Sequence, residues 1–330
     1  MGVGAKKKPG WSRNSMLNDD VLSQILTKVI EKEDRKAFSE VCKQWLSVER
    51  LTRTSLRLSQ PMSPLVLLTR FPNLVDFRSV EQTKKKAKQK IVVLSRLRQP
   101  ARRDGQIVSQ ARDIRGDVGL NAFLNSSRNL RRLCLFDNYI ISDQAFRAIA
   151  SSSISSLELC SCYEISDVGL GFLANGSISK TLMKLIIECC ERITDAGIQH
   201  LVKMSCLEHL ELTYRPYRPF DRVGVTDVGG EAISRIQSLR ELRLNDVRGF
   251  SDATVVALAE NCPNLEVLAL CCGQKNGGVT AAGIRALSSH QCLKHLALFD
   301  VRNLGESDVM RIVFGCPSLE SLVVDESLAS

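Results

Sequence analysis

The sequence has 330 residues, of which 44% are hydrophobic, and a formal net charge of +9. This composition predicts a globular protein, and no apolar run approaches the ~18 residues that a membrane-spanning helix requires, so we expect no membrane partner. The chain starts Met1-Gly2-Val3-Gly4-Ala5-Lys6, with no apolar signal core, so we expect it in the nucleus, the cytoplasm or both. Residues 1–116 contain 25 Lys and Arg against 11 Asp and Glu, and residues 117–330 contain 20 against 25. The excess positive charge belongs to the first third, which argues against a nucleic-acid groove along the rest.

The first part of the chain predicts a disordered basic lead over residues 1–15 and a small helical module over residues 16–58. Asn18, Asp19 or Asp20 is the expected cap of the first helix. The apolar positions are Val21, Leu22, Ile25, Leu26 and Val29 in the first helix, and Ala37, Phe38, Val41, Cys42 and Trp45 in a second that starts near Asp34. A third helix follows at about residues 47–52. Three short helices bury little surface, so we expect the module to need support from the rest of the chain or from a partner.

Residues 59–116 predict a joint, one strand and an inserted loop. Pro61 and Pro64 end the third helix, and the sequence LVDFRS is a degenerate strand phrase. Residues 81–116 then interrupt the repeat with clustered basic side chains: Lys84, Lys85, Lys86, Lys88, Lys90, Arg96, Arg98, Arg102 and Arg103. This loop is either simply solvated or a nuclear-import segment, because basic residues on a flexible segment suit an acidic receptor groove. Nucleic-acid binding is a third alternative, which lacks the interleaved aromatic residues typical of it.

A phrase of the form L-x-x-L-x-I-x-x-C, followed by a helix start, recurs along residues 117–330. Its leading residues are Leu130, Ile154, Leu182, Leu207, Leu239, Leu265, Leu293 and Leu319. The intervals of 24 to 32 residues are those of a leucine-rich repeat, with one strand and one helix in each unit. One unit cannot bury enough surface to fold alone, so we predict an α/β solenoid with parallel strands on its concave face and helices outside. Asp195 is expected to accept from free N–H groups in the first turn of its helix.

The side chains between the core leucines are predicted to face the concave surface, because successive strand residues alternate between faces. They are Arg132, Phe136, Glu158, Lys184, Glu188, His209, Glu211, Glu241, Arg243, Asn245, His295 and Phe299. Mixed charge with a few aromatic residues suits recognition of a protein, although any one of them can be an inert surface residue. The candidate partner-binding residues on this surface are His209, Glu211 and Arg243.

The longest repeat carries an insertion directly after its strand, at residues 214–222. Tyr214, Arg215, Tyr217, Arg218 and Phe220 are its candidate binding residues. Tyr and Arg are enriched at interface hot spots, and the two prolines of the segment lower the cost of ordering it. The alternative is that this segment is a surface loop that the fold accommodates and that binds no partner.

The twelve cysteines predict buried, reduced side chains, because many of them recur in the repeat pattern. Cys162 and Cys190 hold the ninth repeat position, while Cys206, Cys262, Cys292 and Cys316 precede the next strand. A zinc site at Cys160, Cys162, Cys189 and Cys190 is disfavoured, since no C-x-x-C pair exists and the four histidines are not spaced to complete it. The histidines also lack nucleophile partners at a recognisable spacing. We therefore expect no catalytic residues, no metal and no cofactor.

Residues 17–58 resemble an F-box, the adaptor-binding module of SCF-type (cullin–RING) ubiquitin ligases. The resemblance rests on Leu17, Asp20-Val21-Leu22, Ile25-Leu26, Asp34, Val41-Cys42-Lys43 and Trp45, in the order and spacing of L-P-x-(D/E)-(V/I/L)-L, I-(L/F) and V-C-(K/R)-x-W. Asn18 stands where the pattern has proline. With the cysteine-containing repeats that follow, the chain resembles the F-box/leucine-rich-repeat family, and its Asp34-Arg35-Lys36 run is most similar to plant members.

The resemblance implies a substrate receptor that has no enzymatic activity of its own. The F-box would bind a Skp-type adaptor and, through it, the cullin ligase core, while the repeats would bind a protein substrate. The implied adaptor-binding residues are Leu17, Val21, Leu22, Ile25, Leu26, Val41 and Trp45, whose apolar stripe we expect to be exposed. The alternative is a leucine-rich-repeat scaffold or inhibitor unconnected with ubiquitin.

Overall fold

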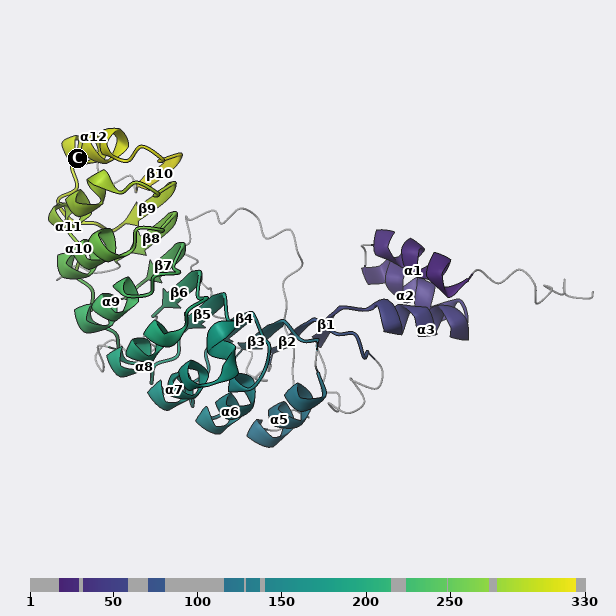
Figure 1. Ribbon diagram of the computed structural model, residues 1–330. Helices are drawn as coiled ribbons and strands as arrows, with labels where there is room; N and C mark the ends of the chain where they lie inside the picture. The colour runs from purple at the N-terminus through teal and green to yellow at the C-terminus, as the bar shows by residue number, and fades with distance from the viewer. Residues whose placement is uncertain are drawn as a thin grey trace, which may run out of the picture. The chain divides into compact units, whose positions relative to one another are not determined.

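The computed structural model describes residues 18–29, 32–58, 71–80, 116–127, 129–136, 140–214, 224–247, 249–272 and 278–324. The chain divides into two compact units (Figure 1). The first contains Met1–Thr54 and Thr69–Asn73, and the second contains Ser55–Leu68 and Leu74–Ser330. None of the helices in the described ranges has the length and apolar character that crossing a bilayer requires.

The first unit consists of the helices α1 (Asp19–Lys28), α2 (Lys32–Glu40) and α3 (Lys43–Thr52). Asn18 caps α1, because its side chain accepts a hydrogen bond from the N–H of Asp20 at 3.2 Å. The core is formed by Leu22, Leu26, Phe38 and Val48, and Trp45 packs on Phe38 with ring centroids 4.2 Å apart. The predicted helical module is thus present, with its cap among the three expected residues.

The predicted second helix is in fact two helices. Helix α2 ends at Glu40, and the extended residue Cys42 precedes α3, which begins with the hydrogen bond from Leu46 N–H to the Cys42 carbonyl. Val41 and Cys42 therefore lie in the connection, and Trp45 belongs to α3. The apolar spacing hid this break because it continues with a helical period from one helix into the next.

A buried carboxylate and a returning segment complete the first unit. Glu49 on α3 is 3% exposed and accepts hydrogen bonds from Arg53, while Arg35 Nε lies 3.8 Å from Glu49 Oε1. The Arg53 guanidinium lies over the ring of Phe71 at 5.5 Å. Asn73 Nδ2 donates to the carbonyl of Leu51 at 2.8 Å, near the end of α3. Residues 71–73, which the sequence placed in a joint, are therefore part of this helical unit.

The second unit is built on one sheet of ten parallel strands that pair in chain order. The strands are β1 (Ser55–Leu58), β2 (Asp76–Val80), β3 (Arg132–Phe136), β4 (Ser156–Cys160), β5 (Lys184–Glu188), β6 (His209–Thr213), β7 (Glu241–Asn245), β8 (Val267–Cys271), β9 (His295–Phe299) and β10 (Ser321–Val324). Strand β1 corrects the predicted boundary at residue 58, because Ser55–Leu58 pairs with β2 and belongs to the sheet. The strand expected in LVDFRS is confirmed as β2.

Helices connect the strands and cover one side of the sheet. They are α5 (Gly116–Ser126), α6 (Phe146–Ala150), α7 (Asp167–Asn175), α8 (Asp195–His200), α9 (Asp227–Ser234), α10 (Asp252–Asn261), α11 (Ala281–Arg285) and α12 (Glu306–Gly315), with 3-10 turns at Asp143–Ala145, Ser177–Lys180, Leu201–Lys203 and Ala286–Ser289. Figure 1 shows the strands on the inner side of this curved unit and the helices on its outer side. The unit is therefore the predicted leucine-rich-repeat solenoid.

The repeat phrase corresponds to the core of the solenoid. Each of the strands β3 to β10 begins two residues after a predicted leading residue, as Lys184 follows Leu182. Within the phrase, Leu182 and Leu185 are 0% exposed. Within β5, Leu185 and Ile187 are buried, and the alternating residues Lys184, Ile186 and Glu188 lie on the opposite face of the sheet, which is the predicted concave surface.

The helix starts are joined by hydrogen bonds between neighbouring repeats. The N–H of Thr226 donates to Asp195 Oδ1 at 2.8 Å, and its hydroxyl donates to Asp195 Oδ2 at 2.7 Å. The same pair of bonds occurs in Asp117–Ser142, Asp143–Ser166, Asp167–Thr194, Asp195–Thr226, Asp227–Ser251 and Asp252–Thr280, which we call the aspartate ladder. The ladder corrects the role expected for Asp195, because Thr194 caps its helix while the carboxylate binds the next repeat.

The ladder also explains a recurring glycine. The N–H of Gly229 donates to Asp195 Oδ1 at 2.9 Å, and a Cβ atom at Gly229 would lie 2.6 Å from the same oxygen. Only glycine lets the helix approach this closely. Helix α11 starts with Ala281 in place of Asp, and there Arg285 Nε instead donates to Asp308 Oδ1 on α12 at 2.7 Å.

Candidate partner-binding surfaces

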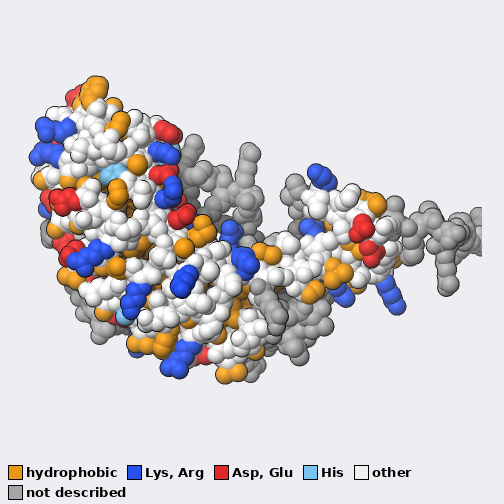
Figure 2. All heavy atoms as spheres, viewed as in Figure 1, with side chains coloured by type: hydrophobic (Ala, Val, Ile, Leu, Met, Phe, Trp, Pro, Cys, Tyr) orange, Lys and Arg blue, Asp and Glu red, His pale blue; other side chains and the backbone are white. Residues whose placement is uncertain are grey.

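The first candidate surface lies on α1 and on the connection that precedes α3. Val21 and Ile25 are exposed one turn apart on α1, and Val41 is 58% exposed. Gln44 Nε2 donates to Asp19 Oδ1 at 2.7 Å, which joins the start of α3 to the start of α1. We call Val21, Ile25 and Val41 the α1–α3 patch, and Figure 2 shows hydrophobic side chains at the surface of this unit.

The structure corrects the predicted composition of this surface. Leu22 and Leu26 are 0% and 1% exposed and lie in the core, so they support the module and offer no face to a partner. Trp45 is partly buried against that core. Leu17 lies outside the described residues. The predicted apolar stripe of α1 therefore contains both core residues and surface residues, because α1 buries one side of its apolar face and exposes the other.

The second candidate surface is the concave face of β6 and β7. The strand register places His209 opposite Glu241 and Glu211 opposite Arg243. His209 Nδ1 lies 2.6 Å from Glu241 Oε2, and His209 Nε2 lies 4.0 Å from Glu211 Oε2. Arg243 Nε donates to Glu241 Oε1 at 2.6 Å. Three of the predicted residues are therefore together, and Glu241 is the member that joins His209 to Arg243.

Glu241 is the electrostatic centre of this cluster. Burial alone would raise its pKa, but the hydrogen bonds and charges of His209 and Arg243 outweigh burial and lower the pKa to about 2. Glu241 is therefore ionised throughout the neutral range. The sequence showed Glu241 as a concave residue but not its pairing, because the partners are 32 and two residues away in the chain and only the strand register brings them together.

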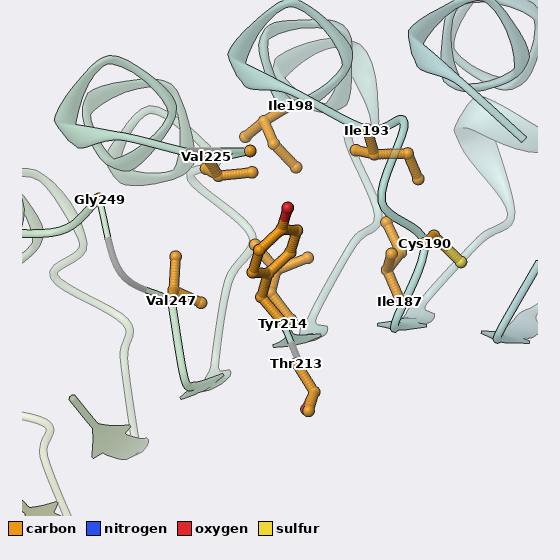
Figure 3. A pocket seen from close by; sticks show the side chains of 11 residues that line it. Ile187, Cys190, Ile193, Ile198, Thr213, Tyr214, Val225, Val247 and Gly249 are labelled. Carbon is orange, nitrogen blue, oxygen red and sulfur yellow. The ribbon is translucent and has the colours of Figure 1, made fainter. Parts of the chain in front are cut away.

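Tyr214 faces the interior of the solenoid. Its ring lines an apolar cavity of about 30 Å³ with Ile193, Ile198 and Val225. Figure 3 shows the ring pointing toward these three side chains, whereas the neighbouring Thr213 points the opposite way. A cavity of this size has room for one or two water molecules at most, and not for an organic ligand. Tyr214 thus packs into the solenoid at the start of the inserted segment while staying partly exposed, and its contact with a partner stays a prediction.

The backbone conformation directly after β6, where that insertion begins, differs from the conformation after most other strands. Ser161, Cys189, Asp246 and Asp300 directly follow their strands with φ values between 53° and 56°. Tyr214 and Cys272 occupy the same place after β6 and β8 but do not have positive φ values. The other predicted residues of the insertion, Arg215, Tyr217, Arg218 and Phe220, lie outside the described residues, as do residues 81–115.

The cysteines of the repeats mostly have a packing role. Cys162 and Cys190 are buried, and the Cys162 thiol donates to the Leu135 carbonyl at 3.5 Å. Burial raises the pKa of Cys262 to about 12, which keeps this thiol protonated. Cys292 departs from the expectation because it is exposed. Across the described ranges, no group of three or more His, Cys, Asp or Glu side chains is placed to hold a metal ion.

Comparison with known proteins agrees with both units. Residues 14–55 match the F-box family. The fold is similar to that of a chain in the crystal structure of the Rad7 and Elc1 complex in yeast, with 16% identity and a TM-score of 0.57 over 92% of this chain and 75% of that chain. A chain in the crystal structure of the TLR13–ssRNA13 complex matches with 18% identity and a TM-score of 0.46 over 84% of this chain and 33% of that chain. An F-box followed by a leucine-rich-repeat solenoid defines a class of two-part proteins. This chain therefore combines an F-box with a leucine-rich-repeat solenoid, the architecture of the F-box/leucine-rich-repeat proteins.

Proposed function

We propose that this protein is the substrate receptor of an SCF-type ubiquitin ligase. The observation that carries the proposal is the F-box match over residues 14–55 in a chain whose remainder is a repeat solenoid. The structurally similar chain also comes from a complex of two proteins, Rad7 and Elc1. In this proposal the ubiquitin chemistry belongs to the cullin-bound RING subunit and its conjugating enzyme, and this chain positions the target.

The α1–α3 patch is the proposed contact for a Skp-type adaptor. Val21, Ile25 and Val41 expose apolar surface on a unit whose own core is already filled by Leu22 and Leu26. When a partner covers exposed apolar groups, the removal of apolar surface from water lowers the free energy of the complex. The adaptor would in turn bring the chain to the cullin ligase core.

The concave face around His209, Glu211, Glu241 and Arg243 is the proposed contact for the protein target. These side chains are partly buried and hold each other in fixed positions, which reduces the entropy lost when a partner binds. The predicted residues of the insertion at 215–220 remain candidates for the same target. The nuclear or cytoplasmic location expected from the sequence fits such a role.

Affinity capture followed by mass spectrometry tests the proposal, because it detects adaptor and target in one experiment. The double variant Ile25→Ala with Val41→Ala should lose the adaptor and keep the target. The variant His209→Ala with Arg243→Ala should do the reverse. Val168→Ala with Val228→Ala, which removes two exposed valines from α7 and α9, is the matched control and should keep both. Absence of any adaptor from the wild-type capture would favour a scaffold unconnected with ubiquitin.

A further inference from the structure

The concave face changes character after β7. Strands β4 to β7 present charged side chains there, such as Glu158, Lys184 and Arg243. On β8, β9 and β10 most of the equivalent positions are apolar, and His295 and Ser321 are the polar exceptions. The apolar ones, which we call the apolar floor, are Val267, Ala269, Cys271, Ala297, Phe299 and Val323. This change is not part of the repeat pattern, because the core leucines continue unchanged on the other face.

The residues of the apolar floor are contiguous. The strand register places Ala269 opposite Ala297, and Ala297 opposite Val323. Cys271 lies opposite Phe299 in the next row. Ala269 is buried and Ala297 is half-buried, and neither has atoms beyond Cβ, so a partner can approach the sheet closely at Ala297. A larger apolar side chain from the partner would then be covered on one side by Phe299.

Carboxylates outnumber cations around the apolar floor. They lie on β7, directly before the strands and directly after them: Glu241, Asp246, Glu266, Asp300 and Glu320, against the cations Arg240, Arg243 and Lys294. Glu266 pairs with Arg240 at 2.5 Å and with Lys294 at 2.7 Å, and Arg243 pairs with Glu241, so the five carboxylates and three cations leave a net charge of −2. Figure 2 shows acidic and basic side chains along the edge of this part of the solenoid. The surplus of negative charge favours a cationic partner.

We infer that the apolar floor binds a basic, amphipathic segment of the target protein, with apolar side chains on Ala297 and Phe299 and flanking Lys or Arg side chains against the surrounding carboxylates. The inference rests on the proposed function, since it names the chemistry of the target segment. The contact that determines target specificity would then lie on β8 to β10, next to the cluster of His209, Glu241 and Arg243 on β6 and β7. Apolar burial supplies affinity, and charge excludes acidic segments of similar hydrophobicity.

Three synthetic peptides of equal length test the inference by fluorescence anisotropy with the purified full chain. The first carries leucines and alanines flanked by lysines and arginines, the second replaces the basic residues by glutamates, and the third replaces the apolar residues by serines. The first should bind at least tenfold more tightly than the other two, and its affinity should fall as salt is raised. Equal affinity for the three peptides would overturn the inference.

A substitution locates the binding. Ala297→Arg should weaken binding of the first peptide at least tenfold, whereas Ala253→Arg, the same change at an exposed position of α10, should not. If Ala297→Arg lowers the melting temperature, Val323→Arg at a 42% exposed position replaces it. Wild-type affinity in a folded variant would overturn the inference. Adaptor binding, measured separately, should be unchanged in each variant, and its absence from the wild type would reject the ligase assignment without touching the peptide result.

Discussion

Removing the aspartate from one pair of the aspartate ladder, which we call a rung, tests how the repeats are coupled. Asp195→Ala deletes the acceptor of three hydrogen bonds, from Thr226 N–H, the Thr226 hydroxyl and Gly229 N–H, at 2.7 to 2.9 Å. Each bond contributes about 1 kcal/mol net, since the carboxylate is only half-buried and water can replace part of what is lost. We therefore expect Asp195→Ala to lower the free energy of unfolding by about 3 kcal/mol.

Two further variants separate the ladder from a simple helix effect. Glu306→Ala removes a first-turn carboxylate from α12, which has no rung in the described structure, and should cost below about 1 kcal/mol. Asp195→Asn keeps one oxygen acceptor but places an NH₂ group opposite the Thr226 hydroxyl, so its cost should be intermediate. Urea unfolding followed by circular dichroism gives all three values. If Asp195→Ala lowers the free energy of unfolding by no more than Glu306→Ala does, the hydrogen bonds of Asp195 do not couple the repeats.

Three other predictions follow from burial and charge. The pKa of Glu241 is lowered to about 2 from the ordinary 4.5, so its contribution to stability is present above about pH 4.5 and is lost as pH falls toward 2. Glu241→Gln should remove this part of the loss of stability in acid, which unfolding at successive pH values measures. A thiol reagent should modify the exposed Cys292 at once but the buried Cys262 only on unfolding, as read by peptide mass spectrometry. Phe71→Ala should destabilise the F-box unit by about 3 kcal/mol and speed hydrogen exchange in α3.

Contrary results have equally specific meanings. An unchanged acid profile in Glu241→Gln would mean that His209 and Arg243 do not hold this carboxylate in its charged form. Fast labelling of Cys262 in the folded chain would contradict the packing of the repeats. Normal exchange in Phe71→Ala would separate residues 71–73 from the helical unit.

The solenoid could be predicted because its core is periodic. Leucines such as Leu182 and Leu185 recur with every strand, and burial in a stacked array is the one arrangement that uses all of them. Strand β1 was missed because the four residues of Ser55–Leu58 follow a helix directly and lack the repeat phrase. Its place in the sheet depends on pairing with β2, which no local pattern records.

The candidate surfaces were predictable only in part. The alternation of side chains along each strand indicated which residues face the concave side, but the contact between His209 and Glu241 depends on strand register. Asp195 was predicted as a helix-start residue, while its bonds to the following repeat depend on the distance between the two helices. The division of the α1 stripe into buried Leu22 and exposed Ile25 follows from where α2 and α3 pack.

Direct binding between this chain and a purified Skp-type adaptor is the measurement closest to the central claim. Isothermal titration calorimetry of the full chain should show one-to-one binding that Ile25→Ala with Val41→Ala abolishes and that Val168→Ala with Val228→Ala leaves unchanged. The heat-capacity change should be negative, because the α1–α3 patch is apolar. Absence of binding by the folded wild-type chain, or full binding by the first double variant, would contradict the account.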